Sequence, residues 1–299
     1  MKYLVTGVNG QLGYDIHKIL NDGKNEVLAP SSKEMNLLDD KRIHEVIEGF
    51  KPDVIIHAAA YTAVDKADES IEEAKKCFLV NVEGTKSIVS AARNVNAKLI
   101  FISTDYVFDG EKEEPYKVSD EVNPINWYGK TKSIAENFVL NYDLGMVVRT
   151  SWVFGIHGKN FVKTMLKLAN TKDELNVVSD QFGSPTYTVD LAKKLVLLSE
   201  SFDRGIYHAT NKGDMSWYEF AKMIFDMFDI NIPVNKVKTF EYKTVATRPM
   251  NTTLDKSKLT NDVGEIESVF DALERYAFEL KHDDEMKLVL KENRNKWMR

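Results

Sequence analysis

Hydrophobic and polar positions follow two different rhythms along the chain. Up to about residue 150, short apolar runs alternate with stretches in which apolar residues recur with the 3.6-residue period of a helix. The apolar runs predict strands at residues 2–6, 26–29, 54–57, 99–103 and 146–150. The periodic stretches predict helices near residues 12–21, 41–50, 70–95 and 130–141. Strands that alternate with helices favour an α/β fold with a Rossmann-type, doubly wound parallel sheet.

After about residue 150 helical patterns dominate. They lie near residues 160–169, 190–200, 216–228 and 269–280, with a short strand-like piece at 205–209. We therefore expect a dinucleotide-binding domain over 1–150, with returning segments at about 186–210. The rest of 151–299 is expected to form a smaller, mostly helical and discontinuous substrate-binding lobe. The charged stretch 281–299 is interpreted as a peripheral helix or a frayed tail.

Charge and composition exclude some classes of protein. The 46 acidic residues outnumber the 40 Lys and Arg, for a formal charge of −6, which argues against a nucleic-acid surface. No apolar run approaches the ~18 residues of a membrane span, so no membrane partner is expected. Cys77 is the one cysteine, which excludes a disulfide within the chain and favours a reducing, cytoplasmic location.

A glycine-rich loop follows the first predicted strand. Gly7, Gly10 and Gly13 lie in Thr6-Gly7-Val8-Asn9-Gly10-Gln11-Leu12-Gly13, where the first helix begins. Glycine allows a tight turn and a close approach of backbone to pyrophosphate, and a helix N-terminus attracts negative charge. The strand–loop–helix context therefore predicts a dinucleotide site.

The tip of the second strand bears on cofactor preference. NAD-binding folds often place an acid there to hold the ribose hydroxyls. Here the sequence reads Ala29-Pro30-Ser31-Ser32-Lys33, with hydroxyls and a lysine suited to a 2′-phosphate. NADPH is favoured, and NADH stays open.

Three residues carry the predicted chemistry. Thr104 lies at the end of an apolar strand, and Tyr128 and Lys132 are four apart, so they share a face if the segment is helical. A nearby ammonium is expected to lower the pKa of a tyrosine. Tyrosine, lysine and a hydroxyl suffice to protonate a ketone while a cofactor delivers hydride. We therefore predict a nicotinamide-dependent oxidoreductase with Tyr128 as proton donor.

The chain resembles the extended short-chain dehydrogenase/reductase family from Lys2 to about Leu280. Beyond the residues above, the matching segments are 57–67, 103–110, 149–155, 180–186 and Arg248-Pro249. The resemblance implies NAD(P)H-dependent reduction of the 4-keto group of dTDP-4-dehydro-6-deoxy-L-mannose to dTDP-L-rhamnose. It also implies a small-molecule sugar-nucleotide as the partner.

The resemblance further implies residue roles. The implied catalytic residues are Thr104, Tyr128 and Lys132. The implied cofactor-binding residues are Gly7, Asn9, Gly10, Gln11, Leu12, Gly13, Ser32, Asn36, Leu37, Ala58, Ala59, Ala60, Tyr128 and Lys132. The implied substrate-binding residues are Val64, Asp65, Thr104, Asp105, Tyr106, Trp152, Asn160, Gln181, Thr186 and Arg248.

The chain departs from the family pattern at the cofactor site. Asn36-Leu37 stands where an Asp–aliphatic pair is common, and Ser32 replaces an arginine at the strand tip. Some relatives bind magnesium through acids at a dimer contact, and Asp15 and Asp190 hold roughly such positions. The simpler interpretation is that both are solvated surface acids. Magnesium and a homodimer are left open, and no metal ligand is assigned.

Three alternatives were weighed. An epimerase or 4,6-dehydratase is disfavoured because dehydration needs two carboxylates after the threonine, whereas Asp105-Tyr106 follows Thr104. A reductase of another nucleotide-linked 4-keto-6-deoxy sugar stays open. So does a non-catalytic subunit resembling the regulatory subunit of methionine adenosyltransferase, because a fold does not fix a function.

Overall fold

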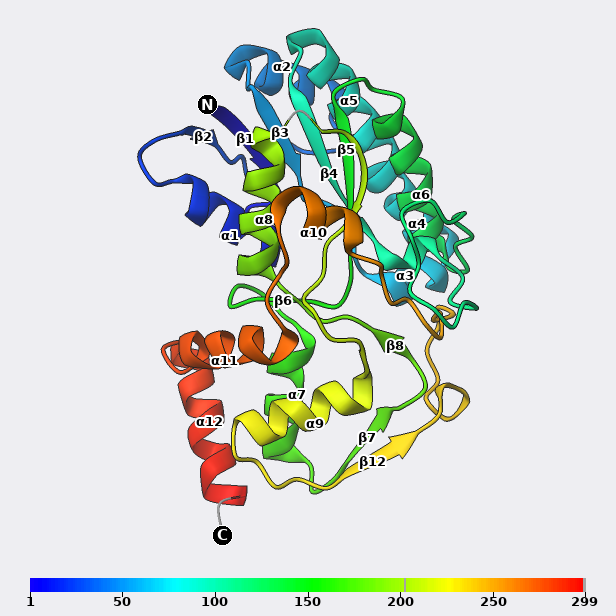
Figure 1. Ribbon diagram of the computed structural model, residues 1–299, viewed down its shortest axis with the longest axis vertical. Helices are drawn as coiled ribbons and strands as arrows, with labels where there is room; N and C mark the ends of the chain where they lie inside the picture. The colour runs from blue at the N-terminus through cyan, green and yellow to red at the C-terminus, as the bar shows by residue number, and fades with distance from the viewer. Residues whose placement is uncertain (202, 298–299) are drawn as a thin grey trace.

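A six-stranded parallel sheet forms the centre of the first domain in the computed structural model, which describes residues 1–201 and 203–297. The strands are β1 (Lys2–Thr6), β2 (Glu26–Leu28), β3 (Val54–His57), β4 (Lys98–Thr104), β5 (Gly145–Thr150) and β10 (Gly205–His208). Their order is β10-β5-β4-β3-β1-β2. Figure 1 labels the five strands from β5 to β2. Every residue of β3 and β5 is buried, as in a sheet covered on both faces. The predicted α/β fold with a doubly wound parallel sheet is confirmed.

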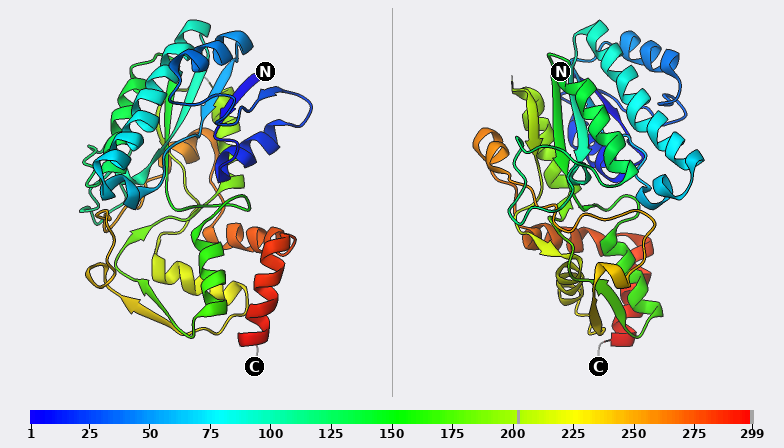
Figure 2. Two further views of the ribbon diagram at one scale, coloured as in Figure 1. Left: turned by 180° about the vertical axis from the view of Figure 1, so that it is seen from behind. Right: turned by 90° about the vertical axis from the view of Figure 1, so that its right-hand side faces the viewer.

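Helices cover both faces of the sheet (Figure 2). One face carries α1 (Gln11–Leu20), α8 (Thr188–Glu200) and α10 (Ser257–Val263), whose apolar residues share a core with β1 and β5. The other face carries α2 (Asp40–Phe50), α5 (Gly84–Val95) and α6 (Trp127–Leu140). The short helices α3 (Val64–Glu69) and α4 (Ile71–Phe78) lie next to α6.

The predicted single helix over residues 70–95 is wrong in detail. A π-helical turn at Leu79–Glu83 separates α4 from α5. Asn81, on this turn, accepts a hydrogen bond from the Tyr61 N–H at 2.8 Å. The wider turn therefore places a polar side chain against the segment that follows β3, and apolar periodicity alone does not predict such a turn.

A second lobe lies below the sheet in Figure 1. It contains α7 (Phe161–Thr171), α9 (Trp217–Met227), α11 (Val269–Leu280) and α12 (Asp284–Trp297), with a parallel strand pair, β7 (Leu175–Val178) and β12 (Val234–Val237). Its own apolar core includes Leu166, Phe220 and Leu273. The chain passes repeatedly between the lobes, since α8 and β10 return to the sheet.

The remaining elements connect these parts. They are the strand pairs β6 (Val153–Phe154) with β9 (Thr186–Tyr187) and β8 (Phe182–Gly183) with β11 (Met215–Ser216), and the 3₁₀ turns Asp105–Val107 and Thr239–Glu241.

The charged C-terminal stretch forms a helix rather than a frayed tail over its described part. Helix α12 packs on α7, where Asn293 donates to the Leu166 carbonyl and Trp297 Nε1 donates to the Ala169 carbonyl, both at 2.9 Å. Within residues 1–201 and 203–297, we find no helix with the length and apolarity needed to cross a bilayer.

Candidate active site

The predicted cofactor loop lies where neighbouring strands β1 and β3 end. Here the connections leave toward opposite faces of the sheet, which is where open α/β folds bind ligands. Gly7 has φ 79°, and a Cβ there would lie 2.8 Å from the Ala59 nitrogen. A Cβ at Gly13 would lie 2.2 Å from the Gly7 oxygen. Gly10 caps α1 without a side-chain hydrogen bond, so the helix N–H groups stay free to meet an anion.

A cleft of about 720 Å³ runs from this loop to the predicted catalytic residues. It brings together most of the cofactor and catalytic residues expected from sequence. Its lining includes Gly7, Asn9, Gly10, Gln11, Leu12, Gly13, Ala58, Ala59, Ala60, Val64, Thr104, Asp105, Tyr106, Tyr128, Lys132 and Trp152. An adjoining cavity of about 220 Å³ shares Gly7, Asn9, Ala59 and Ala60 with it and adds Ser32, Asn36 and Leu37. Together they form one elongated site.

Helix α6 positions Tyr128 and Lys132. The helix begins at Trp127, earlier than predicted, because the Asn126 side chain accepts from the Gly129 N–H at 2.8 Å and caps it. Lys132 is buried and donates from Nζ to the carbonyl oxygen of Ile102, on β4, at 2.6 Å. Burial lowers the pKa of Lys132 to about 7, and the Glu136 carboxylate opposes this shift.

The expected lowering of the Tyr128 pKa by Lys132 is not found. Burial raises the pKa of Tyr128 above its usual value, and a hydrogen bond with the Thr104 side chain partly opposes the shift. The phenol therefore keeps its proton at neutral pH, the state that a proton donor needs.

Buried hydrogen bonds hold Thr104 and Asp105 in place. The Thr104 hydroxyl donates to Asp105 Oδ1 at 3.0 Å and accepts from the Tyr106 N–H at 3.2 Å. Thr252, far along the chain, donates to Asp105 Oδ2 at 2.5 Å. Burial raises the pKa of Asp105 to about 6, although these hydroxyl contacts lower it. The orientation of Thr104 thus depends on a carboxylate with two hydroxyl partners.

Two predicted substrate residues pair with each other. Arg248 Nη2 lies 2.6 Å from Asp65 Oδ2, and the Ala246 N–H donates to Asp65 Oδ1 at 3.1 Å. Both contacts join the segment after β12 to α3 of the first domain. Neither Asp65 nor Arg248 is among the residues that line the cleft.

Three further predicted substrate residues make contacts within the protein. Asn160 caps α7 and donates from Nδ2 to Gln11 Oε1 at 3.0 Å, so it ties the glycine loop to the second lobe. Gln181 donates to the Thr239 hydroxyl at 3.1 Å. Thr186 is fully buried and donates from its backbone to the Trp152 carbonyl at 3.2 Å. None of these three is among the cleft-lining residues.

Sequence reasoning missed several residues of the lining. They are Thr62, Ile102, Ser103, Thr150, Ser151, Val153, Gly158, Lys159 and Trp217. Thr62, Ser103, Thr150, Ser151 and Val153 lie in segments that match the family. Ser216 followed by Glu219 is the pattern of a capping box and predicts a helix that starts at Trp217. That pattern does not say which cleft the helix start faces.

Asp15 and Asp190 are not solvated surface acids, so that interpretation is wrong. Both are buried. Asp15 accepts a hydrogen bond from Thr188, and Asp190 accepts from Asn211 at 2.8 Å and pairs with Arg275 at 2.7 Å. Over the described ranges 1–201 and 203–297, His, Cys, Asp and Glu form no group of three or more suited to a metal ion.

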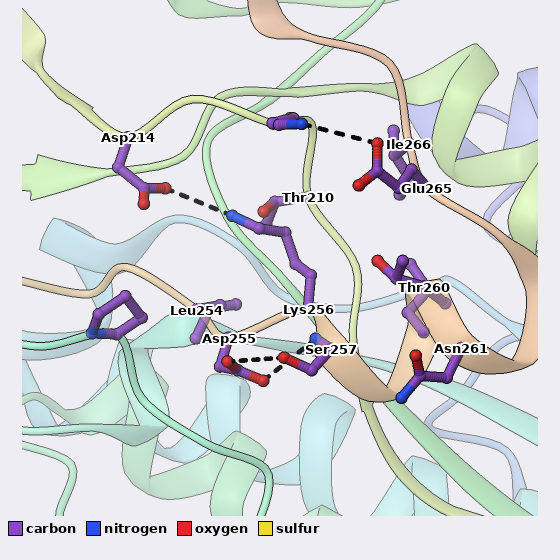
Figure 3. A pocket seen from close by; sticks show the side chains of 13 residues that line it. Thr210, Asp214, Leu254, Asp255, Lys256, Ser257, Thr260, Asn261, Glu265 and Ile266 are labelled. Atoms are coloured by element: carbon purple, nitrogen blue, oxygen red, sulfur yellow. Dashed lines mark hydrogen bonds and ion pairs between the residues drawn. The ribbon is translucent and has the colours of Figure 1, made fainter.

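A separate cavity of about 410 Å³ lies beside α10 (Figure 3). Its charged side chains pair with one another: Lys256 lies 3.4 Å from Asp214, and Lys212 lies 3.6 Å from Glu265. Among the described residues that line it, none belongs to the predicted site. This cavity is therefore separate from the cleft that holds Tyr128.

Comparisons with known proteins identify the family. The family profile described as RmlD substrate binding domain matches residues 1–281. The dTDP-4-dehydrorhamnose reductase of Aggregatibacter actinomycetemcomitans is 42% identical over 88% of this chain and 93% of its own length. A dTDP-4-keto-6-deoxy-D-glucose reductase of Streptomyces niveus is 37% identical over 75% of this chain and 77% of its own.

A solved structure extends the agreement to three dimensions. The dTDP-4-dehydrorhamnose reductase of Bacillus anthracis, crystallised in complex with NADP, superposes with a TM-score of 0.89 at 36% identity. The match covers 93% of this chain and 99% of that one. The resemblance predicted from the sequence motifs is thus confirmed, and the chain belongs to the RmlD family of dTDP-4-dehydrorhamnose reductases.

Proposed function

We propose that this chain reduces the 4-keto group of dTDP-4-dehydro-6-deoxy-L-mannose to give dTDP-L-rhamnose, with NADPH as reductant and Tyr128 as proton donor. The observation that carries the proposal is the single cleft in which Thr104, Tyr128 and Lys132 share a lining with the glycine loop. The family membership and the names of the relatives support the substrate class.

The residues of the site fit a dinucleotide. Gly7 and Gly13 stand where a Cβ would collide with backbone, and the uncapped start of α1 suits a pyrophosphate. Ser32, Asn36 and Leu37 would hold the adenosine end, and Lys33 beside them would favour a 2′-phosphate. When bound, the nicotinamide supplies the hydride that reduces the carbonyl carbon.

Tyr128 supplies the proton. Its raised pKa keeps the phenol protonated until negative charge develops on the sugar oxygen. Transfer of that proton forms the new O–H bond and leaves a phenolate, which the Thr104 hydroxyl and the Lys132 ammonium would stabilise. The hydride and the proton together balance the reduction of a ketone to an alcohol.

Another sugar is the second candidate substrate. The Streptomyces niveus relative is named for dTDP-4-keto-6-deoxy-D-glucose, a hexose that differs from dTDP-4-dehydrorhamnose only in ring configuration. The same three residues would serve both reductions, because each adds a hydride and a proton to the same carbonyl. The contacts around the ring, and not the catalytic trio, must decide between them.

The test is NADPH oxidation by the purified chain with each of the two sugar nucleotides, followed by NMR identification of the product. The proposal expects substrate-dependent oxidation and dTDP-L-rhamnose as product. Faster turnover of dTDP-4-keto-6-deoxy-D-glucose would move the assignment to the second candidate. If neither sugar is reduced while NADPH binds, and the chain elutes with a larger synthetase, the non-catalytic subunit is the better interpretation.

A further inference from the structure

Trp152 has the most unusual backbone conformation in the site. It has φ 46°, in the left-handed region that bulky side chains rarely adopt. Among residues 1–201 and 203–297, the other non-glycine residues with positive φ are Lys51, Asn96 and Asp229, and all three stand at or just after helix C-termini, where this conformation is common. Trp152 lies instead between β5 and β6, in the lining of the cleft. Such strain persists only where the surroundings hold it.

The backbone around Trp152 is held by two hydrogen bonds. The Thr186 N–H donates to the Trp152 carbonyl at 3.2 Å, and the Ser151 hydroxyl donates to the Ser184 carbonyl at 2.6 Å. Both partners belong to the segment around β9, so the conformation depends on the second lobe.

The indole of Trp152 occupies a slot formed by residues from β8 and the start of α9. Its ring stacks on Trp217 with centroids 3.4 Å apart and an angle of 8° between the planes. A Cβ at Gly183 would lie 2.6 Å from Trp152 Cε2, so the absence of a side chain at residue 183 makes room for the ring. Moving either neighbour would therefore move Trp152.

Trp217 is itself fixed in place. It is the first residue of α9, and Ser216 and Glu219 form a reciprocal capping box there. The ring of Phe161 lies against it at 4.6 Å between centroids. Strand β11 pairs Ser216 with Phe182 and Met215 with Gly183, so Gly183 and the residue before Trp217 are held by one strand pair.

The stacked pair shares the cleft with the predicted catalytic residues. Trp152 and Trp217 line the same cleft as Val64, Thr104 and Tyr128, and neither lines the adenosine cavity. A 6-deoxyhexose has an apolar methyl group and apolar C–H faces, which pack well on aromatic rings.

We propose that Trp217 is a substrate-positioning residue: it stacks on Trp152, keeps that indole in place above its strained backbone, and so fixes an aromatic wall against which the 6-deoxyhexose packs. The inference rests on the proposed function for the identity of the sugar. The stacking itself is independent of that function.

The first readout is spectroscopic. Stacked indoles couple their far-ultraviolet transitions and give a paired positive and negative band in circular dichroism. Trp217→Leu is expected to abolish this feature. Trp297→Phe, which changes a tryptophan of α12, is the matched control and should retain it.

The second readout separates sugar binding from cofactor binding. In Trp217→Leu, the KM for the dTDP-linked 4-keto sugar should rise about tenfold with a smaller change in kcat, while the Kd for NADPH should stay within about twofold. Trp217→Phe should restore much of the KM. Gly183→Ala adds a methyl group that would collide with the Trp152 ring from its other neighbour. It should therefore raise the KM as Trp217→Leu does.

The outcomes are distinct. No turnover by the wild type overturns the proposed function, and this inference with it. With an active wild type, an unchanged KM in Trp217→Leu overturns the inference alone. A parallel loss of NADPH affinity would also overturn it, because it would show general damage to the fold.

Discussion

Glu136 and Arg149 form a fork-shaped ion pair inside the first domain. Arg149 Nη2 lies 2.7 Å from Glu136 Oε2, and Arg149 Nε donates to Glu136 Oε1 at 2.9 Å. The side chain of Arg149 is 2% exposed and that of Glu136 is 3% exposed. Glu136 lies on α6 one helical turn after Lys132, and Arg149 lies on β5. The pair therefore joins the helix that carries Tyr128 and Lys132 to the sheet.

Removing the charge of one partner should lower the free energy of unfolding. Glu136→Gln leaves the Arg149 charge buried without its counter-charge, which typically costs about 3–5 kcal/mol in the free energy of unfolding. Chemical denaturation monitored by circular dichroism measures this loss. The matched control is Glu45→Gln in the exposed pair Lys41–Glu45, where the expected loss is below about 0.5 kcal/mol. Equal losses in the two variants would contradict the account of the buried pair.

Asp105 should give the protein a pH-dependent stability that Asp105→Asn lacks. Burial raises the pKa of this carboxyl from its ordinary value of 3.8 to about 6, so the folded protein holds a proton that the unfolded chain has released. The proton bound to Asp105 stabilises the folded state to its full extent below about pH 4. This stabilisation is lost as pH rises through about 6. The stability of the wild type relative to the variant should thus fall by about 2 kcal/mol between pH 4 and pH 7.

Urea denaturation of both proteins at several values between pH 4 and pH 7 measures this difference. Asparagine changes the hydrogen bonds with Thr104 and Thr252, but that change is the same at every pH. A difference that stays constant, or that grows with pH, would contradict a raised pKa.

Lys33 should set the preference for NADPH. Lys33→Glu replaces a cation beside the adenosine cavity with an anion, which would repel a 2′-phosphate. The Kd for NADPH should rise at least about tenfold, while the Kd for NADH changes by less than about twofold. Fluorescence titration measures both constants. Lys24→Glu, on an exposed turn, is the control, and equal effects on the two cofactors would contradict the role of Lys33.

Local signals in the sequence were enough to predict the tight glycine loop and the end of β4. Gly7 and Gly13 are required by contacts within a few residues or with the neighbouring strand end, and Thr104 follows directly from an apolar strand. The four-residue spacing of Tyr128 and Lys132 predicts a shared face if the segment is helical, although the predicted helix near 130–141 left Tyr128 out.

Local signals of this kind do not predict contacts between the lobes. The amide groups of Gln11 and Asn160 bond to each other across the lobes, although the resemblance implied a cofactor role for one and a substrate role for the other. The stacking of Trp152 on Trp217 likewise depends on how α9 and β8 pack. Hydrophobic periodicity describes which face of an element is buried, and not which distant side chain meets it.

Tyr128→Phe tests the central claim most directly, because it removes one hydroxyl and keeps the ring. The account predicts that kcat for reduction of the dTDP-linked 4-keto sugar falls by about 10²–10⁴, the usual contribution of a positioned acid, while the Kd for NADPH stays within about twofold. Turnover near the wild-type rate would contradict the assignment of Tyr128 as the proton donor.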